Sequence, residues 1–210
     1  MVVAKTEERS TGAGTPALVT GTSTEFLGGK PIPRRVRERR VVFVLGPPGS
    51  GKTSVARRLS GTGAHELDAK AVQAALVDRI GALGWSEELL SAPSLVLDGP
   101  VWLRNRPAVV EVLCELLTLR AEAGLRTVVC QADRDASIHL LVGALAVHHY
   151  VVLGLRLPVG RRGRMRFARR MCDKLGLEHG AARGTADIEP WSYAAVARHL
   201  RAWQHLPFGG

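Results

Sequence analysis

Residues 41–60 read VVFVLGPPGSGKTSVARRLS: an apolar run, a glycine-rich turn and an amphipathic segment. The turn contains G-x-x-x-x-G-K-[ST], the Walker A pattern of loops that hold a nucleoside triphosphate. Glycines let such a loop turn tightly, so that several backbone N–H groups face one anion, and the following helix points its amino end at the same anion. The sequence therefore predicts a buried strand, a phosphate-binding loop and a helix over about residues 51–59.

The residues of this loop have distinct expected tasks. Lys52 brings a positive charge to the β- and γ-phosphates, and the Thr53 hydroxyl is a ligand for Mg²⁺. We expect the whole loop to bind nucleotide, namely Gly46, Pro47, Pro48, Gly49, Ser50, Gly51, Lys52 and Thr53. The chain has no guanine-specificity motif of the N-K-x-D type, which favours ATP over GTP.

A second part of the site is predicted at the buried strand SLVLDG, residues 94–99. Asp98, at the end of its apolar run, is placed as a carboxylate that reaches Mg²⁺ directly or through water. Many hydrolysing ATPases place a water-activating glutamate next, whereas this chain has Gly99, and Glu111 and Glu115 on the following helix are expected to face solvent. Hydrolysis is therefore expected to be slow or to use another base.

A third strand is predicted at RTVVCQAD, residues 126–133, and it ends with Gln131 and Asp133. If this strand lies beside the one that ends at Asp98, a polar side chain at its tip points at the γ-phosphate, and either residue could position water there. We predict Lys52, Asp98 and Asp133 as catalytic residues, Thr53 and Asp98 as metal ligands, and ATP and Mg²⁺ as cofactors.

From residue 41 onward, strand-length apolar runs alternate with segments of helical period, and AHELDA, residues 64–69, is expected to be a short further strand. Continuous apolar strands separated by helices indicate an α/β fold with a parallel sheet covered by helices on both faces. We expect a disordered basic tail over residues 1–40, a P-loop nucleotide-binding core over 41–158, and a short helical lid or partner-binding lobe over 159–207.

Positive charge is concentrated in two segments of a chain whose net charge is +10. Residues 30–40 carry a net +5 and residues 156–170 a net +7, so the remainder is slightly acidic. Such patches suit a polyanion, either nucleic acid or the phosphates of a nucleotide. We expect DNA or an acidic protein to bind through Arg34, Arg35, Arg37, Arg39 and Arg40, and through Arg161, Arg162, Arg164, Arg166, Arg169 and Arg170.

Composition indicates the compartment. The chain has 210 residues, 46% of them hydrophobic, enough for one α/β domain with a small extra lobe. The longest apolar runs are far shorter than the roughly 20 residues that cross a bilayer, and no secretory signal is evident, so no membrane association is expected. Cys114, Cys130 and Cys172 form no metal-type pair. We expect a cytoplasmic protein with reduced, mostly buried thiols.

The order of these pieces is also informative. GPPGSGKT, LVLDG, AGLRTVVCQADRD, LGLRLP and GRMRFARRMCDKLGL follow one another between about residues 41 and 177. In this order they resemble the AAA+ module of bacterial replication-initiator (DnaA-type) ATPases and their shorter adaptor relatives. The resemblance implies an ATP-binding switch or slow ATPase that acts on DNA or a protein partner. It also implies a sensor role for Asp133 and a helical lid after Pro158.

This sequence departs from that family at two places. Where the family carries an Arg-Phe pair that reaches a neighbour's ATP, the chain reads HHY, residues 148–150. For the arginine that the family's lid supplies, Arg198 is the nearest candidate. These departures, together with Gly99, imply a protein that binds ATP more surely than it hydrolyses it.

A nucleotide or small-molecule kinase is the alternative interpretation. GPPGSGKT is also similar to the phosphate loop of adenylate-kinase-like enzymes, where Asp68 would be the acceptor ligand or base and the arginines of residues 161–170 would clamp phosphates. Such an enzyme would transfer the γ-phosphoryl of ATP without a partner subunit. The final helix, EPWSYAAVARHLRAW, suits a lid or a partner-facing element better and favours the AAA+ interpretation.

Overall fold

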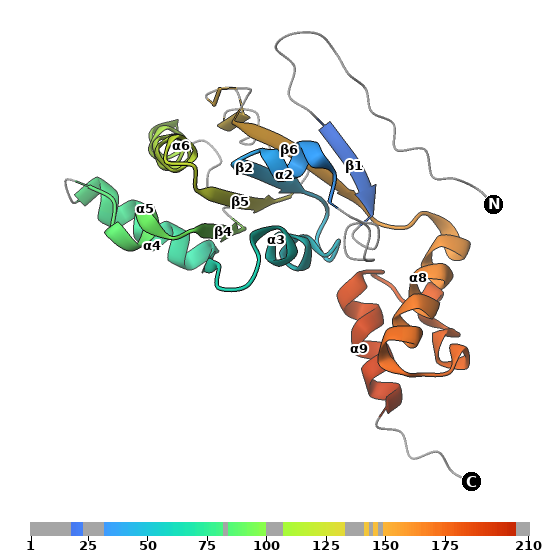
Figure 1. Ribbon diagram of the computed structural model, residues 1–210. Coiled ribbons are helices and arrows are strands. Elements are labelled where there is room, and N and C mark those ends of the chain that lie inside the picture. The colour runs from blue at the N-terminus through green and yellow to red at the C-terminus, as the bar shows by residue number, and fades with distance from the viewer. Residues whose placement is uncertain are drawn as a thin grey trace.

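One parallel sheet organises the molecule (Figure 1). The computed structural model describes residues 18–22, 32–81, 84–99, 107–132, 141–142, 145–146 and 149–204. Within them lie six strands, β1 (Leu18–Thr22), β2 (Val41–Leu45), β3 (His65–Asp68), β4 (Ser94–Asp98), β5 (Arg126–Gln131) and β6 (Tyr150–Arg156). Their order across the sheet is β1-β6-β2-β5-β4-β3, and every neighbouring pair is parallel. The predicted parallel α/β fold is confirmed.

Helices occupy most of the connections between these strands. The α-helices are α2 (Arg34–Glu38), α3 (Lys52–Ser60), α4 (Ala69–Gly81), α5 (Glu87–Ser91), α6 (Pro107–Glu122), α8 (Gly160–Leu175) and α9 (Tyr193–Gln204). Two short 3-10 helices, η2 (His179–Ala182) and η3 (Thr185–Asp187), join α8 to α9. In the described ranges, no helix is long and apolar enough to cross a membrane.

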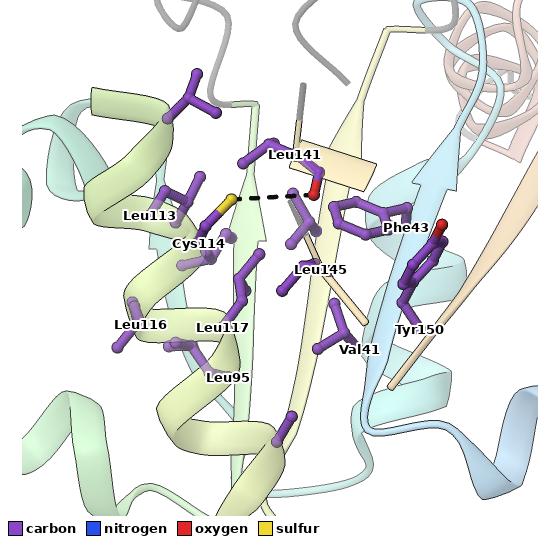
Figure 2. Packing of buried hydrophobic residues seen from close by; sticks show 14 of the residues in the cluster. Val41, Phe43, Leu95, Leu113, Cys114, Leu116, Leu117, Leu141, Leu145 and Tyr150 are labelled. Carbon is purple, nitrogen blue, oxygen red and sulfur yellow. Dashed lines mark hydrogen bonds between the residues drawn. The ribbon is translucent and has the colours of Figure 1, made fainter. Parts of the chain in front are cut away.

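The two faces of the sheet bury different sets of side chains, because successive residues of a strand point to opposite faces. Val42 and Val44 of β2 pack in the cluster that holds α3, whereas Val41 and Phe43 pack in the cluster that holds α4 and α6. Figure 2 shows α6 directing its apolar residues at this second face, where the Cys114 thiol lies 3.9 Å from the Leu141 carbonyl oxygen. Helices therefore pack against both faces of the sheet.

The C-terminal lobe has a core of its own, to one side of the sheet (Figure 1). Phe167 of α8, Trp191 and Tyr193 form an aromatic triad with ring-centroid distances of 4.2, 5.4 and 5.7 Å. The Trp191 indole donates a hydrogen bond to the Thr185 carbonyl oxygen at 3.0 Å. Burying three aromatic side chains contributes several kcal/mol to holding α8 and α9 together.

The N-terminal segment differs from the disorder expected for residues 1–40. Residues 18–22 form β1, which pairs in parallel with β6, and residues 34–38 form α2. The physical reason lies partly in Val36, which is fully buried against the sheet, and partly in Arg126. The Arg126 guanidinium donates to the carbonyl oxygens of Val36, Arg37 and Arg39 at 3.2, 2.6 and 3.3 Å, and so holds the end of α2. Residues 1–17 and 23–31 lie outside the described part of the chain.

Candidate nucleotide-binding site

The loop between β2 and α3 has a shape that requires glycine. Gly49 and Gly51 have φ angles of 72° and 83°, the left-handed region that side chains disfavour. At Gly46 a Cβ atom would lie 2.6 Å from Ser50 Oγ and 2.9 Å from the Leu155 carbonyl oxygen. Glycines at these positions let the loop fold back over the end of the sheet at the amino end of α3.

Lys52 curls back over this loop. Its ammonium group donates hydrogen bonds to the carbonyl oxygens of Gly46 and Pro47 at 2.8 and 3.0 Å. Both acceptors are neutral main-chain groups, so the positive charge is held within the curve of the loop. Ser50 of the same loop is fully buried, and Ser50 Oγ has no hydrogen-bond partner among the described residues.

Thr53 and Asp98 meet although they are far apart in the sequence. The Thr53 hydroxyl donates to Asp98 Oδ2 at 2.6 Å, which links the first turn of α3 to the end of β4. The parallel sheet causes this contact, because the carboxyl ends of β2 and β4 meet at one edge. A hydroxyl and a carboxylate are oxygen groups of the kind that Mg²⁺ prefers.

Gln131 ends the strand that lies between β2 and β4. It is paired with Leu45 in the sheet, and its own carbonyl oxygen accepts a hydrogen bond from the Gly46 N–H at 3.2 Å. Gln131 is only 1% exposed, so it is a buried residue whose backbone adjoins the start of the loop. Asp133, which the sequence analysis preferred for the catalytic role, lies outside the described residues. The sequence signal for a role of Gln131 in the site is its position at the end of a buried strand.

Asp98 is followed by a turn rather than by a carboxylate. Gly99 has a φ angle of 80°, and its N–H donates to the Cys130 carbonyl oxygen at 3.0 Å. Glu111 is exposed, as expected. Glu115 is half-buried, with 40% of its side chain exposed, and its carboxylate accepts from Arg79 at 3.0 and 3.1 Å and from the Trp85 indole at 3.3 Å. Its acceptor oxygens therefore serve the packing of α4 against α6.

Charged groups of the site affect the pKa of a buried thiol, that of Cys130. Burial is the main cause that raises the pKa of Cys130 far above its usual range, Asp98 raises it further, and Lys52 opposes this shift. Cys114 and Cys172 are also free and buried, and burial raises the pKa of Cys114 to about 11. All three thiols are therefore protonated and unreactive at neutral pH.

The C-terminal lobe touches the loop directly. The Tyr193 N–H, in the first turn of α9, donates to the Gly49 carbonyl oxygen at 3.1 Å. Ser192 caps the same helix by accepting from the Ala195 N–H at 3.0 Å, and a Cβ atom on Gly49 would lie 2.3 Å from Ser192 Cβ. Sequence reasoning missed this contact, although Ser192 is a residue type that favours the start of a helix. Arg198 is exposed and lies about 7.5 Å from Tyr193 along the axis of α9.

Three other candidates lie away from the loop. Asp68 ends the edge strand β3 and accepts from the Ala71 N–H at 2.8 Å, so it caps α4. His149 and Tyr150 lie at the amino end of β6, the edge opposite the loop, where the His149 carbonyl oxygen accepts from the Val41 N–H at 3.0 Å. His148, the first residue of the HHY segment, lies outside the described ranges.

A parallel sheet with a glycine-rich loop between a central strand and a helix, and with a helical lobe on that loop, is also the fold of solved DnaA and RuvB structures. DnaA bound to AMPPCP and single-stranded DNA aligns with a TM-score of 0.62 and 12% identity, over 80% of this chain and 56% of that chain. Domain III of Thermotoga maritima DnaA aligns with a TM-score of 0.56 and 18% identity, over 81% of this chain and 76% of that domain.

A RuvB point mutant from Thermotoga maritima aligns with a TM-score of 0.52 and 18% identity, over 85% of this chain and 57% of that one. The chain thus spans a little over half the length of the DnaA and RuvB chains, apart from the isolated domain III. No protein-family model and no curated protein matches the sequence. At these identities the likeness establishes the fold.

Proposed function

We propose that this chain is an ATP-binding, AAA+-like P-loop protein, a slow ATPase or ATP-gated switch that acts on DNA or a protein partner. One observation carries the proposal: Lys52 and the hydrogen-bonded pair of Thr53 and Asp98 converge at the carboxyl edge of the sheet. A DnaA structure of the same fold holds AMPPCP, an ATP analogue, together with single-stranded DNA.

The residues present fit ATP with Mg²⁺. The N–H groups of the loop and the Lys52 ammonium would hold the β- and γ-phosphates, and Ser50 offers a buried hydroxyl that has no other partner among the described residues. Thr53 and Asp98 supply two oxygen ligands suited to Mg²⁺. When bound, Mg²⁺ would offset negative charge on the phosphate oxygens.

Slow ATP hydrolysis is expected from the residues that surround Lys52, Thr53 and Asp98. Gly99 provides no general base, and Glu115 is held by Arg79 and Trp85. Gln131 and Asp133 are the proposed groups that would orient water at the γ-phosphate, Gln131 because its backbone adjoins the start of the loop. We place the protein in the cytoplasm, where its three buried thiols would stay reduced.

The kinase alternative has less support. Its acceptor residue would be Asp68, at the end of edge strand β3. Three strand spacings separate β3 from β2, so Asp68 lies about 14 Å across the sheet from the strand that carries the loop. One oxygen of Asp68 already caps α4.

Calorimetric titration with ATP and MgCl₂ tests the proposal. The protein should bind ATP, and Lys52→Ala should abolish the heat of association, whereas Lys70→Ala on the exposed face of α4 should bind like the wild type. A folded wild type that binds neither purine triphosphate would show the proposal to be wrong. Release of ADP that depends on an added acceptor, measured with a panel of nucleotides and small molecules, would favour the kinase alternative instead.

A further inference from the structure

The lobe carries more positive charge than the sheet it rests on. Residues 41–158 contain equal numbers of basic and acidic side chains, whereas residues 159–210 carry a net +6. Most of this excess is on α8, which has six arginines and one lysine against the single acid Asp173. A field of this kind attracts anions, and which anion it suits depends on how the arginines are arranged.

The arginines of α8 fall into two sets. Arg161 and Arg164 pair within the lobe, with Asp187 at 3.4 Å and Glu189 at 2.9 Å. The remaining four are exposed and make no ion pair or hydrogen bond within the part of the chain that the structure describes: Arg162, Arg166, Arg169 and Arg170. Helical spacing places these four on one face over two turns, opposite the buried Phe167, Ala168 and Cys172.

The chemistry of this face distinguishes among polyanions. A protein interface has apolar or aromatic anchors at its centre, but every exposed residue from 161 to 174 of α8 is charged. A helix that lies on a membrane needs an available apolar face, and the apolar residues of α8 are buried against α9 and η2. The exposed face of α8 is therefore a row of arginine guanidinium groups. These suit phosphate, because a guanidinium binds phosphate through two N–H groups at once.

We propose that Arg162, Arg166, Arg169 and Arg170 form a face that binds the phosphate backbone of a nucleic acid. This inference rests on the proposed function, because it names the partner and the surface of the same switch. The face belongs to the lobe whose helix α9 bonds to the phosphate loop at Gly49, so nucleic acid on α8 is one packed helix away from the nucleotide.

The other basic segment lacks such a connection. Arg34 is paired with Glu38 within α2, and Arg126 fixes the end of α2 at the amino edge of the sheet. That edge is opposite the phosphate loop, which follows the carboxyl end of β2. Of the two basic segments predicted from the sequence, α8 is therefore the one placed to couple nucleic acid with nucleotide.

Fluorescence anisotropy with labelled DNA tests the face by its salt dependence. Single-stranded and double-stranded oligonucleotides of equal length are titrated with the full chain from about 50 to about 200 mM salt, where each phosphate contact contributes about 0.7 to 0.9 to the slope of log affinity against log salt. The variant R162Q/R166Q/R169Q/R170Q should lower that slope by about 3 and weaken binding at least roughly tenfold at the lower salt. Comparison of the two DNA forms shows which one the face prefers.

The matched control removes the same charge elsewhere. R34Q/R35Q/R37Q/R40Q neutralises four exposed arginines of the tail and should keep the wild-type slope. Equal slopes for the wild type and the α8 variant, or equal losses in both variants, would overturn the proposal. So would displacement of DNA by poly-glutamate at equal charge concentration, which would indicate an acidic protein partner.

Two further measurements keep the result interpretable. The α8 variant should bind ATP with the wild-type heat, since none of its four residues belongs to the nucleotide site. A wild type that binds DNA through α8 but no ATP would contradict the proposed function while supporting this face. If the fourfold variant loses its native circular dichroism, R166Q and R169Q are compared singly, and each should lower the slope by about 0.8. An unchanged slope in both would overturn the proposal.

Discussion

Asp98 combines two tasks at the scale of single residues: it accepts a hydrogen bond from the Thr53 hydroxyl at 2.6 Å and is proposed to bind Mg²⁺. Asp98→Asn keeps an oxygen acceptor but removes the charge, so ATP affinity should lose most of its dependence on Mg²⁺ and fall about 10- to 100-fold in its presence. Thr53→Ser keeps the hydroxyl and should bind like the wild type. Titrations with and without MgCl₂ measure this, and an equal Mg²⁺ effect in Asp98→Asn would contradict the assignment.

Arg120 is the largest fully buried side chain of the described residues. It donates to Thr127 Oγ1 at 2.9 Å, to the carbonyl oxygens of Ala92 and Arg126 at 2.8 and 2.9 Å, and to that of Leu89. Burial lowers the pKa of its guanidinium, but no partner is a carboxylate. The Arg120 guanidinium thus joins α6, the segment before β4 and the start of β5.

Replacing Arg120 should therefore destabilise the fold without touching the nucleotide site. Arg120→Met leaves several buried acceptors without donors, which should lower the free energy of unfolding by about 2–4 kcal/mol. Arg198→Met, on the exposed face of α9, should change it by less than about 0.5 kcal/mol. Urea denaturation measures both, and coincident curves for Arg120→Met and the wild type would show that these hydrogen bonds contribute little.

At the scale of elements, the sequence predicts a strand well where burial on both faces leaves a continuous apolar run. VVFVL and SLVLD are such runs, and their parallel pairing follows from the helices between them. By contrast, LVTGT of β1 has no such signal, since its place depends on pairing with β6, more than 130 residues later. The contact of α9 with Gly49 was equally inaccessible, because it depends on how the lobe packs and not on local pattern.

That contact can be tested by comparing two glycines. Gly49 and Gly61 have φ angles of 72° and 79°, but a Cβ atom on Gly61 would meet nothing within 4 Å, whereas one on Gly49 would collide with Ser192. Gly61 has a ψ angle of −176°, so Gly61→Ala should cost the backbone penalty of this glycine-only region alone, about 1–3 kcal/mol of stability. Gly49→Ala should cost more and should also weaken ATP binding, because the loop and the start of α9 must separate. Equal urea midpoints and equal ATP affinities in the two variants would show that the contact is unimportant.

At the scale of the whole molecule, two proposed sites, the phosphate loop and the arginines of α8, are linked within the described residues by the contact of α9 with Gly49. The phosphate loop is proposed to hold a triphosphate and α8 a nucleic acid, and between them lie the aromatic core of the lobe and the Tyr193–Gly49 hydrogen bond. Filling the loop with phosphates would change the environment of Gly49, so the proposed switch predicts that the position of α9 and the angle of α8 would change with nucleotide. A ligand shifts such an equilibrium only as far as its affinity differs between the two arrangements.

Coupling of this kind must be reciprocal. If ATP changes the DNA affinity by some factor, typically about 5- to 150-fold, DNA must change the ATP affinity by the same factor. Anisotropy with and without ATP gives the first factor, and calorimetry with and without DNA gives the second. Gly49→Ala should bring both factors toward unity together, whereas Gly61→Ala should leave both intact, since only the first substitution disturbs the junction. Tight binding of both ligands with no mutual effect would show that the lobe does not transmit nucleotide state to α8.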